Sequence, residues 1–125
     1  MECACTVGVD FNEDHVKLNI ITTPFARRVE ICNECDRDIH VGEDYRKEIF
    51  EHHGRSIHRT CEDCLSVREV FFSDGWYYGH ICELMNNFIS ECDGDLSIRC
   101  IRELTKTARD RVLDEVERIY ERSYE

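Results

Sequence analysis

Two short motifs in one stretch decide the fold: Cys32-Asn33-Glu34-Cys35 and Cys61-Glu62-Asp63-Cys64. The two-residue gap within each motif lets both of its sulfur atoms turn toward a single metal ion, about 2.3 Å away. Two such pairs complete a tetrahedron, and the intervening residues 36–60 are enough for a hairpin that returns the chain. Thiolates are soft ligands, and four of them suit zinc, with iron as the main competitor. The sequence therefore predicts one metal site, formed by Cys32, Cys35, Cys61 and Cys64.

The order of the elements around these motifs is that of a treble clef. The first motif precedes a turn, residues 44–50 begin a short hairpin that turns near His53-Gly54, and the second motif opens a helix. A knuckle, a hairpin and a helix that carries the last two ligands in its first turn make up this zinc fold. The start of a helix favours thiolate, because its free N–H groups and its dipole stabilise negative charge. A closed shell of four thiolates leaves no open position on the ion, so we expect a structural site and no catalytic residue.

His58 offers an alternative ligand, because it lies three residues before Cys61. His-x-x-Cys spacing also occurs in zinc fingers, so His58 and Cys61 could bind the ion and release Cys64. We favour Cys64, because it completes a symmetric pair at the start of the helix. The sequence alone leaves this choice open.

Four further residues could form a second zinc site. Cys3 and Cys5 lie on one face of an extended segment, and His80 and Cys82 lie near the start of a later helix. An ion held by these four would join the N-terminus to that helix. The competing interpretation is that the cysteines are small buried hydrophobes, which is the usual state of a free cysteine. The protein would bind one zinc ion, or two if this second site forms.

The rest of the chain predicts strands before the metal module and helices after it. Alternating apolar residues across residues 1–30 indicate extended structure, and Pro24 marks a boundary. Apolar residues three or four apart predict helices over residues 61–72, over residues 79–92 and from Thr105 onward. We expect one compact α+β domain with an extended N-terminal segment, a zinc treble clef and a C-terminal segment of two or three packed helices, at residues 1–30, 31–74 and 75–125.

The charge balance restricts the partners. The chain has 125 residues, with 16 Lys and Arg against 27 Asp and Glu, and a formal net charge of −11. Such a field repels a phosphate backbone and attracts a basic protein surface, so nucleic acid is an unfavourable partner. No stretch approaches the roughly 18 apolar residues that a membrane helix needs, and nothing resembles a signal peptide. Nine cysteines in such a chain indicate a reducing cytoplasm, where paired cysteines bind metal.

A pattern of residues between Ala26 and Cys64 resembles a known group of proteins. It consists of Ala26-Arg27, Cys32-Asn33-Glu34-Cys35, Ile39, Gly42-Glu43, Tyr45 and Thr60-Cys61-Glu62-Asp63-Cys64. The group comprises small, mostly uncharacterised treble-clef proteins encoded by tailed phages and prophages. Looser similarity extends to Cys3-Ala4-Cys5, Gly79 and Ala108-Arg109. The resemblance implies a zinc fold and a phage or prophage origin, hence a host cytoplasm, and it brings no established activity.

We expect a small acidic zinc-stabilised module that binds another protein and is not an enzyme. On this expectation the partner is a host protein with a basic surface, such as a factor that handles nucleic acid, although the charge could serve solubility alone. The candidate contacts are acidic residues near the knuckle and two aromatic residues: Glu34, Asp36, Asp38, Glu43, Asp44, Trp76 and Tyr77. Two alternatives are a nucleic-acid-binding zinc finger, which needs a basic face, and a metal-dependent hydrolase, which needs an open metal position. The sequence does not indicate the oligomeric state.

Overall fold

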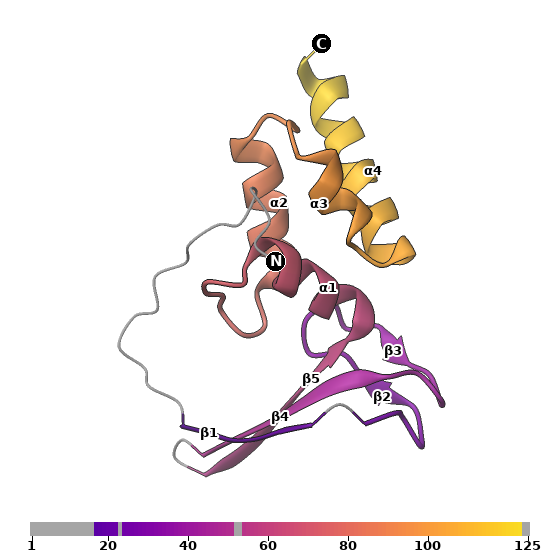
Figure 1. The fold of residues 1–125 in the computed structure, drawn as a ribbon, viewed down its shortest axis with the longest axis vertical. Helices are drawn as coiled ribbons and strands as arrows, with labels where there is room; N and C mark the ends of the chain where they lie inside the picture. Colours follow the sequence, from indigo (N-terminus) through magenta and orange to yellow (C-terminus); the bar gives the residue numbers. More distant parts are fainter. Residues whose placement is uncertain (1–16, 23, 52–53, 124–125) are drawn as a thin grey trace.

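The computed structural model describes residues 17–22, 24–51 and 54–123, and it has an α+β fold (Figure 1). The first half forms the strands β1 (Lys17–Thr22), β2 (Glu30–Ile31), β3 (Asp38–Ile39), β4 (Tyr45–Glu51) and β5 (Arg55–Cys61). The second half forms the helices α1 (Glu62–Phe71), α2 (Ile81–Glu91), α3 (Ile98–Arg102) and α4 (Lys106–Ser123). The expected α+β class is confirmed. The extended structure expected for residues 1–16, with Cys3 and Cys5, lies outside the described residues.

The strands form two antiparallel sheets. β1, β4 and β5 make a three-stranded sheet in the order β1-β4-β5, so β5 is an edge strand. The β4–β5 hairpin keeps an unbroken register, from Tyr45 opposite Cys61 to Glu51 opposite Arg55. β2 and β3 form a separate two-stranded sheet. The hairpin places Cys61 at the end of β5, where α1 begins at the next residue.

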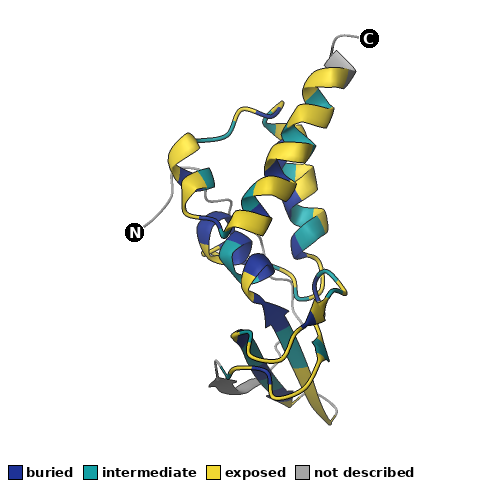
Figure 2. Cartoon of the chain, turned by 90° about the vertical axis from the view of Figure 1, so that its right-hand side faces the viewer, coloured by how far each residue is buried: buried dark blue, intermediate teal, exposed yellow. Residues whose placement is uncertain are grey.

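Two clusters of buried side chains stabilise the fold. The larger one lies among the helices and contains Val67, Val70, Phe71, Phe72, Ile81, Met85, Ile89, Cys100, Leu104, Ala108 and Val112. Figure 2 shows the resulting contrast along α4, which is buried on one side and exposed on the other. The smaller cluster surrounds the thiols and contains Ala26, Cys32, Ile39, Tyr45, Cys61 and Cys64. Because this smaller cluster buries few large apolar side chains, a metal crosslink would add stability where the core is thin.

A buried ion pair joins the sheet to the helices. Arg68 Nη1 of α1 donates to Glu48 Oε1 of β4 over 2.8 Å, and both side chains are almost fully buried. The Tyr78 hydroxyl donates to the other oxygen of this carboxylate over 2.6 Å. The half-buried Trp76 ring lies 4.3 Å from the guanidinium carbon of Arg68. The segment between α1 and α2 therefore packs over the ion pair, while Tyr77 within it is 37% exposed.

The helices begin and end close to the expected residues, and the structure adds one. The helices expected over residues 61–72 and 79–92 correspond to α1 and α2, and the third corresponds to α4. Thr105 precedes α4, and its hydroxyl oxygen accepts Ala108 N–H over 3.3 Å, as an N-cap does. The sequence does not predict α3, because its five residues are too few to show a helical period. No helix in the described part of the chain is long and apolar enough to cross a membrane.

Candidate metal centre

Four thiols converge between the small sheet, the hairpin and α1. The sulfur atoms of Cys32, Cys35, Cys61 and Cys64 all lie within 4.8 Å of one another, and those of Cys35 and Cys61 are 3.8 Å apart. A tetrahedral zinc ion with bonds of about 2.3 Å would separate its sulfur ligands by about 3.8 Å. The cluster therefore has the dimensions and the ligand chemistry of a four-thiolate site, and it could hold a zinc ion.

The first two thiols lie on a tight turn that follows β2. Asp36 N–H donates to the Cys32 carbonyl over 2.9 Å, and Cys32 N–H donates to the Arg37 carbonyl over 2.9 Å. Asp36 has left-handed backbone, with a φ of 63°, which aspartate tolerates better than most residues. The turn is docked on β5, because Asn33 N–H donates to the Arg59 carbonyl over 2.8 Å. These bonds hold both thiols of the first motif against the end of the hairpin.

The other two thiols lie at the junction of β5 and α1. Cys61 is the N-cap of α1, and its sulfur accepts Cys64 N–H over 3.5 Å. Cys32 Sγ accepts Glu34 N–H over 3.4 Å and Cys61 N–H over 3.3 Å. Backbone N–H groups that point at sulfur stabilise the thiolate, and so does the positive end of the α1 dipole. The local backbone thus favours the charged form of cysteine that binds metal.

Crowding shifts the pKa values of the thiols in opposite directions. Contact with the Cys32 thiol first, and then with Cys61 and Cys64, holds the pKa of Cys35 well below its ordinary value. Contact with Cys32 and then with Cys35 raises the pKa of Cys61 and of Cys64 well above its ordinary value. Four thiolates at such distances repel one another, so they cannot all ionise unless a cation lies between them. A divalent metal ion supplies that charge, and its binding releases the remaining protons.

His58 contacts a carboxylate instead of the thiols. Its Nε2 lies 2.7 Å from Glu34 Oε2, and the Glu34 side chain is fully buried. The same carboxylate accepts Gly79 N–H over 2.8 Å and Ile81 N–H over 3.0 Å at the start of α2. Among the described residues, the group of possible metal ligands contains Cys64 and does not contain His58. The structure thus places His58 outside the four-cysteine cluster, in contact with Glu34, which lies between the candidate ligands Cys32 and Cys35.

Each cysteine motif contributes one carboxylate that binds the start of a distant helix. The Glu34 carboxylate binds the start of α2. Because the Glu34 side chain is buried, the expectation that it contacts a partner is wrong. The Asp63 carboxylate binds the start of α4, where Thr105 Oγ1 donates to Asp63 Oδ1 over 2.6 Å. Arg37 Nε lies 3.3 Å from the other oxygen of Asp63. Sequence reasoning missed both links, because their partners are far away along the chain.

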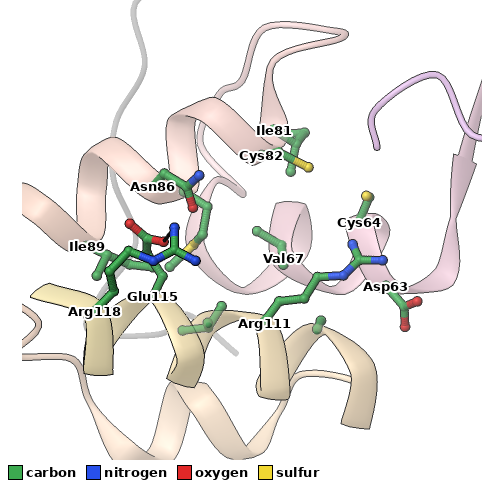
Figure 3. A pocket seen from close by; sticks show the side chains of 13 residues that line it. Asp63, Cys64, Val67, Ile81, Cys82, Asn86, Ile89, Arg111, Glu115 and Arg118 are labelled. Carbon is green, nitrogen blue, oxygen red and sulfur yellow. Dashed lines mark ion pairs between the residues drawn. The ribbon is translucent and has the colours of Figure 1, made fainter. Parts of the chain in front are cut away.

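The residues suggested for a second zinc site take different places. His80 is exposed, and its Nδ1 lies 3.3 Å from Glu83 Oε2. Cys82 packs against the four-cysteine cluster, and together with Cys64 it borders a pocket of about 280 Å³ between α1, α2 and α4 (Figure 3). Cys3 and Cys5 lie outside the described residues. The structure therefore associates Cys82 with the first site.

Arg111 is a further residue of this pocket that sequence reasoning missed. It extends from α4 toward the thiols (Figure 3). Burial lowers the pKa of Arg111, but the contact with the Cys35 thiol and the charges of Cys35, Cys64 and Asp63 together raise it above its ordinary value. A divalent ion with four thiolates carries a net charge of about −2, so a nearby guanidinium stabilises it. Arg111 is itself exposed, but it follows the buried Ala108 by three residues and adjoins the buried Val112, and that position beside the apolar stripe is its signal in the sequence.

The remaining contact candidates differ in their exposure. Asp36, Asp38 and Asp44 are exposed. Glu43 is half-buried, and Arg37 donates to its two carboxylate oxygens over 3.2 and 2.8 Å. The three exposed carboxylates near the knuckle are therefore accessible to another molecule.

Comparison with known proteins identifies no relative of this chain. A scan against protein-family models finds no match, and neither does a search of curated proteins or of solved structures. The assignment of the metal centre therefore depends on the chemistry and geometry of the four cysteines themselves.

Proposed function

We propose that this protein is a zinc-stabilised module of the treble-clef type, which binds another protein and has no catalytic role. The observation that carries the proposal is the approach of four cysteine sulfur atoms to within 4.8 Å of one another. The order of the elements supports the treble-clef assignment: the knuckle follows β2, the β4–β5 hairpin comes next, and α1 carries Cys64 in its first turn.

Burial and ligand chemistry favour a structural ion over a catalytic one. Cys32 and Cys61 are fully buried, and Cys64 is 2% exposed. Four thiolates fill a tetrahedral shell, so a substrate or a water molecule finds no open position on the ion. Glu34 and Asp63 lie between these ligands and bind the starts of α2 and α4. The ion would therefore also fix where the helical half attaches.

Metal analysis tests this proposal. We expect about one zinc ion per chain, by elemental analysis of protein prepared without chelators. Cys61→Ser should remove the ion and unfold the module, because metal binding at such sites contributes on the order of 10 kcal/mol to folding. Cys92→Ser is the matched control, because Cys92 caps the far end of α2 and lies outside the four-cysteine cluster. Protein without zinc, or a Cys61→Ser variant with an unchanged melting temperature, would contradict the proposal.

The protein-binding role is inferred from charge and from the resemblance to phage-encoded proteins. The chain carries a net charge of −11, and Asp36, Asp38 and Asp44 are exposed near the knuckle. Complementary charge accelerates encounter with a basic surface. On this proposal the partner is a host protein with a basic surface, such as a factor that handles nucleic acid, and the two meet in the host cytoplasm.

A further inference from the structure

We propose that the outer edge of β5 is a docking site for an extended, acidic strand of a partner protein. This inference rests on the protein-binding role and adds to it a second surface, for a segment opposite in charge to the basic partner proposed at the knuckle. β5 ends its sheet, with β4 on one side and no strand of the described residues on the other.

The hydrogen bonds of Arg59 show which residues of β5 point away from β4. In an antiparallel pair, residues alternate between those that bond to the partner strand and those whose N–H and C=O groups point outward. Arg59 C=O accepts Asn33 N–H over 2.8 Å, and Arg59 N–H donates to Asn33 Oδ1 over 2.7 Å. Cys61 N–H also points outward, toward a sulfur atom of the metal centre. Because the β4–β5 register is unbroken, Ile57 and Arg55 have the same outward orientation.

Ile57 and Arg55 form the uncovered part of this edge. Within residues 17–22, 24–51 and 54–123, no backbone group bonds to the outward N–H and C=O of either residue. Both residues are exposed, and Ile57 is 41% exposed. An uncovered strand edge is a template for pairing with another extended chain. Asn33 already bonds to Arg59 in this manner, so the edge accepts an added segment without distortion of the hairpin.

A groove beside the edge offers a place for one side chain of the added strand. It has a volume of about 380 Å³ and is lined by Asn33, Phe50, Ser56, Ile57, His58, Tyr78 and Gly79. The rings of Phe50 and Tyr78 meet edge to face, with centroids 4.8 Å apart. Side chains of an extended strand point alternately to opposite faces, so every second one could enter the groove. The aromatic lining favours an apolar side chain at that position.

The charges around this edge select an acidic strand. Lys47 lies opposite Arg59 in the register, and both lie on the same face as Ile57. Glu30 is close to these cations: hydrogen bonding to Arg28 first, and then the charges of Arg59 and Lys47, hold its pKa below its ordinary value. This neighbourhood is cationic within a chain of net charge −11, because Arg28, Lys47, Arg55 and Arg59 outnumber Glu30 and Glu51. The free N–H and C=O groups favour a peptide over nucleic acid, which has no matching backbone.

A synthetic peptide that alternates glutamate with valine tests the proposal. Fluorescence polarisation would follow the binding of this labelled peptide to the zinc-loaded, full-length protein. We expect saturable binding that is weaker by about tenfold or more when lysine replaces glutamate, because like charges repel. A central proline in the peptide should weaken binding similarly, because it removes a donor from the ladder. Amide hydrogen exchange at Ile57 and Arg55 should slow when the glutamate peptide is added.

Two variants place the binding on β5. Ile57→Pro should abolish binding, because it removes an outward N–H, and the hairpin keeps its ladder since that N–H does not bond to β4. Arg55→Glu should weaken binding several-fold. Arg99→Glu on α3 is the matched control, because it makes the same charge change at an exposed residue of another element. If Ile57→Pro fails to fold, the exchange measurement on the unaltered protein decides.

Several outcomes would overturn the proposal. One is that the lysine peptide binds as tightly as the glutamate peptide. Another is that the zinc-loaded Ile57→Pro variant still binds the glutamate peptide. A third is that the unaltered protein does not bind the glutamate peptide. Tighter binding of a single-stranded oligonucleotide at this edge would overturn it as well, and would favour a nucleic-acid-binding role. The zinc content and melting temperature of each protein are read separately. Loss of peptide binding in a folded, zinc-loaded protein would contradict the β5 site alone, whereas loss of zinc would contradict the proposed metal module.

Discussion

Glu34 lies between Cys32 and Cys35, two candidate metal ligands, and its carboxylate accepts N–H groups at the start of α2. It bonds to Gly79 N–H and Ile81 N–H, and it contacts His58. Burial alone would raise the pKa of Glu34. Hydrogen bonds from His58 and then from the two N–H groups outweigh this effect, so the pKa lies below its ordinary value. The carboxylate is therefore held in its charged form, at the positive end of the α2 dipole. One side chain thus attaches the metal module to the helical half.

Replacement of Glu34 tests this attachment. Glu34→Ala should lower the free energy of unfolding by about 3 kcal/mol, because it leaves the buried Ile81 N–H and the partly buried Gly79 N–H without an acceptor. Zinc content should stay at one ion per chain, because Glu34 is not among the four candidate ligands. Denaturant unfolding and elemental analysis measure the two quantities. Asp38→Ala, at an exposed acidic residue of the same knuckle, should change stability by less than about 0.5 kcal/mol. Loss of zinc from Glu34→Ala would give Glu34 a different role.

The start of α4 is bound to the second cysteine motif in a similar way. The Thr105 hydroxyl donates to Asp63 over 2.6 Å and accepts Ala108 N–H over 3.3 Å. It is therefore the cap of α4 and a crosslink to α1 at once. The cap agrees with the expectation from the sequence, because a threonine before an apolar helical stripe is a local signal. The crosslink could not be predicted, because Asp63 is 42 residues away.

Removal of the Thr105 hydroxyl should loosen α4. Thr105→Ala should lower the free energy of unfolding by about 2 kcal/mol, because both the cap and the bond to Asp63 are lost. Thr105→Ser keeps the hydroxyl and should stay within about 0.5 kcal/mol of the unaltered protein. Thr107→Ala, at an exposed residue of the same helix, should also change the free energy of unfolding by less than about 0.5 kcal/mol. Urea unfolding monitored by circular dichroism measures these differences, and equal stability of the alanine and serine variants at Thr105 would refute the crosslink.

At the scale of the whole molecule, opposite charges occupy different regions of the surface. The exposed carboxylates Asp36, Asp38 and Asp44 lie near the knuckle, whereas Lys47 and Arg59 lie on the hairpin. The net charge of −11 therefore does not describe every face of the protein. A basic partner surface would be steered toward the knuckle, and an acidic strand toward β5.

Charge reversal at the knuckle tests the first of these attractions. Asp38→Lys combined with Asp44→Lys should slow association with a basic partner several-fold and reduce its salt dependence, because steering is electrostatic. Asp36 is left unchanged, because its φ of 63° disfavours lysine. Asp114→Lys with Glu117→Lys, on the exposed part of α4, makes the same change in charge at a distance. Stopped-flow association rates measure the effect. Rates that ignore both salt and the knuckle reversals would show that the charge has no part in binding.

The features that the sequence predicts are those with local signals. The cysteine spacing predicts that the two motifs form one four-cysteine cluster. The periodic apolar residues predict the positions of α1, α2 and α4. The features it does not predict are those with partners far along the chain. The burial of Glu34 is not predicted, because it depends on a bond to the distant Ile81. The interaction of the exposed Arg111 with Cys35 is not predicted either, because the two residues lie far apart in the sequence. The edge of β5 likewise becomes visible only when the bonds of Arg59 fix its orientation.

The bond between Glu34 and Ile81 also bears on how fast the protein folds. The two residues are 47 positions apart, so closing that loop in a flexible chain carries a substantial entropy cost. An ion bound to Cys35 and Cys64 shortens the path, because only residues 64–81 then separate the knuckle from α2. Because the closure cost grows with the logarithm of loop length, the shorter loop lowers the free energy of loop closure by roughly 0.9 kcal/mol. Metal loading would therefore accelerate the docking of α2 several-fold, even though none of its four candidate ligands belongs to that helix.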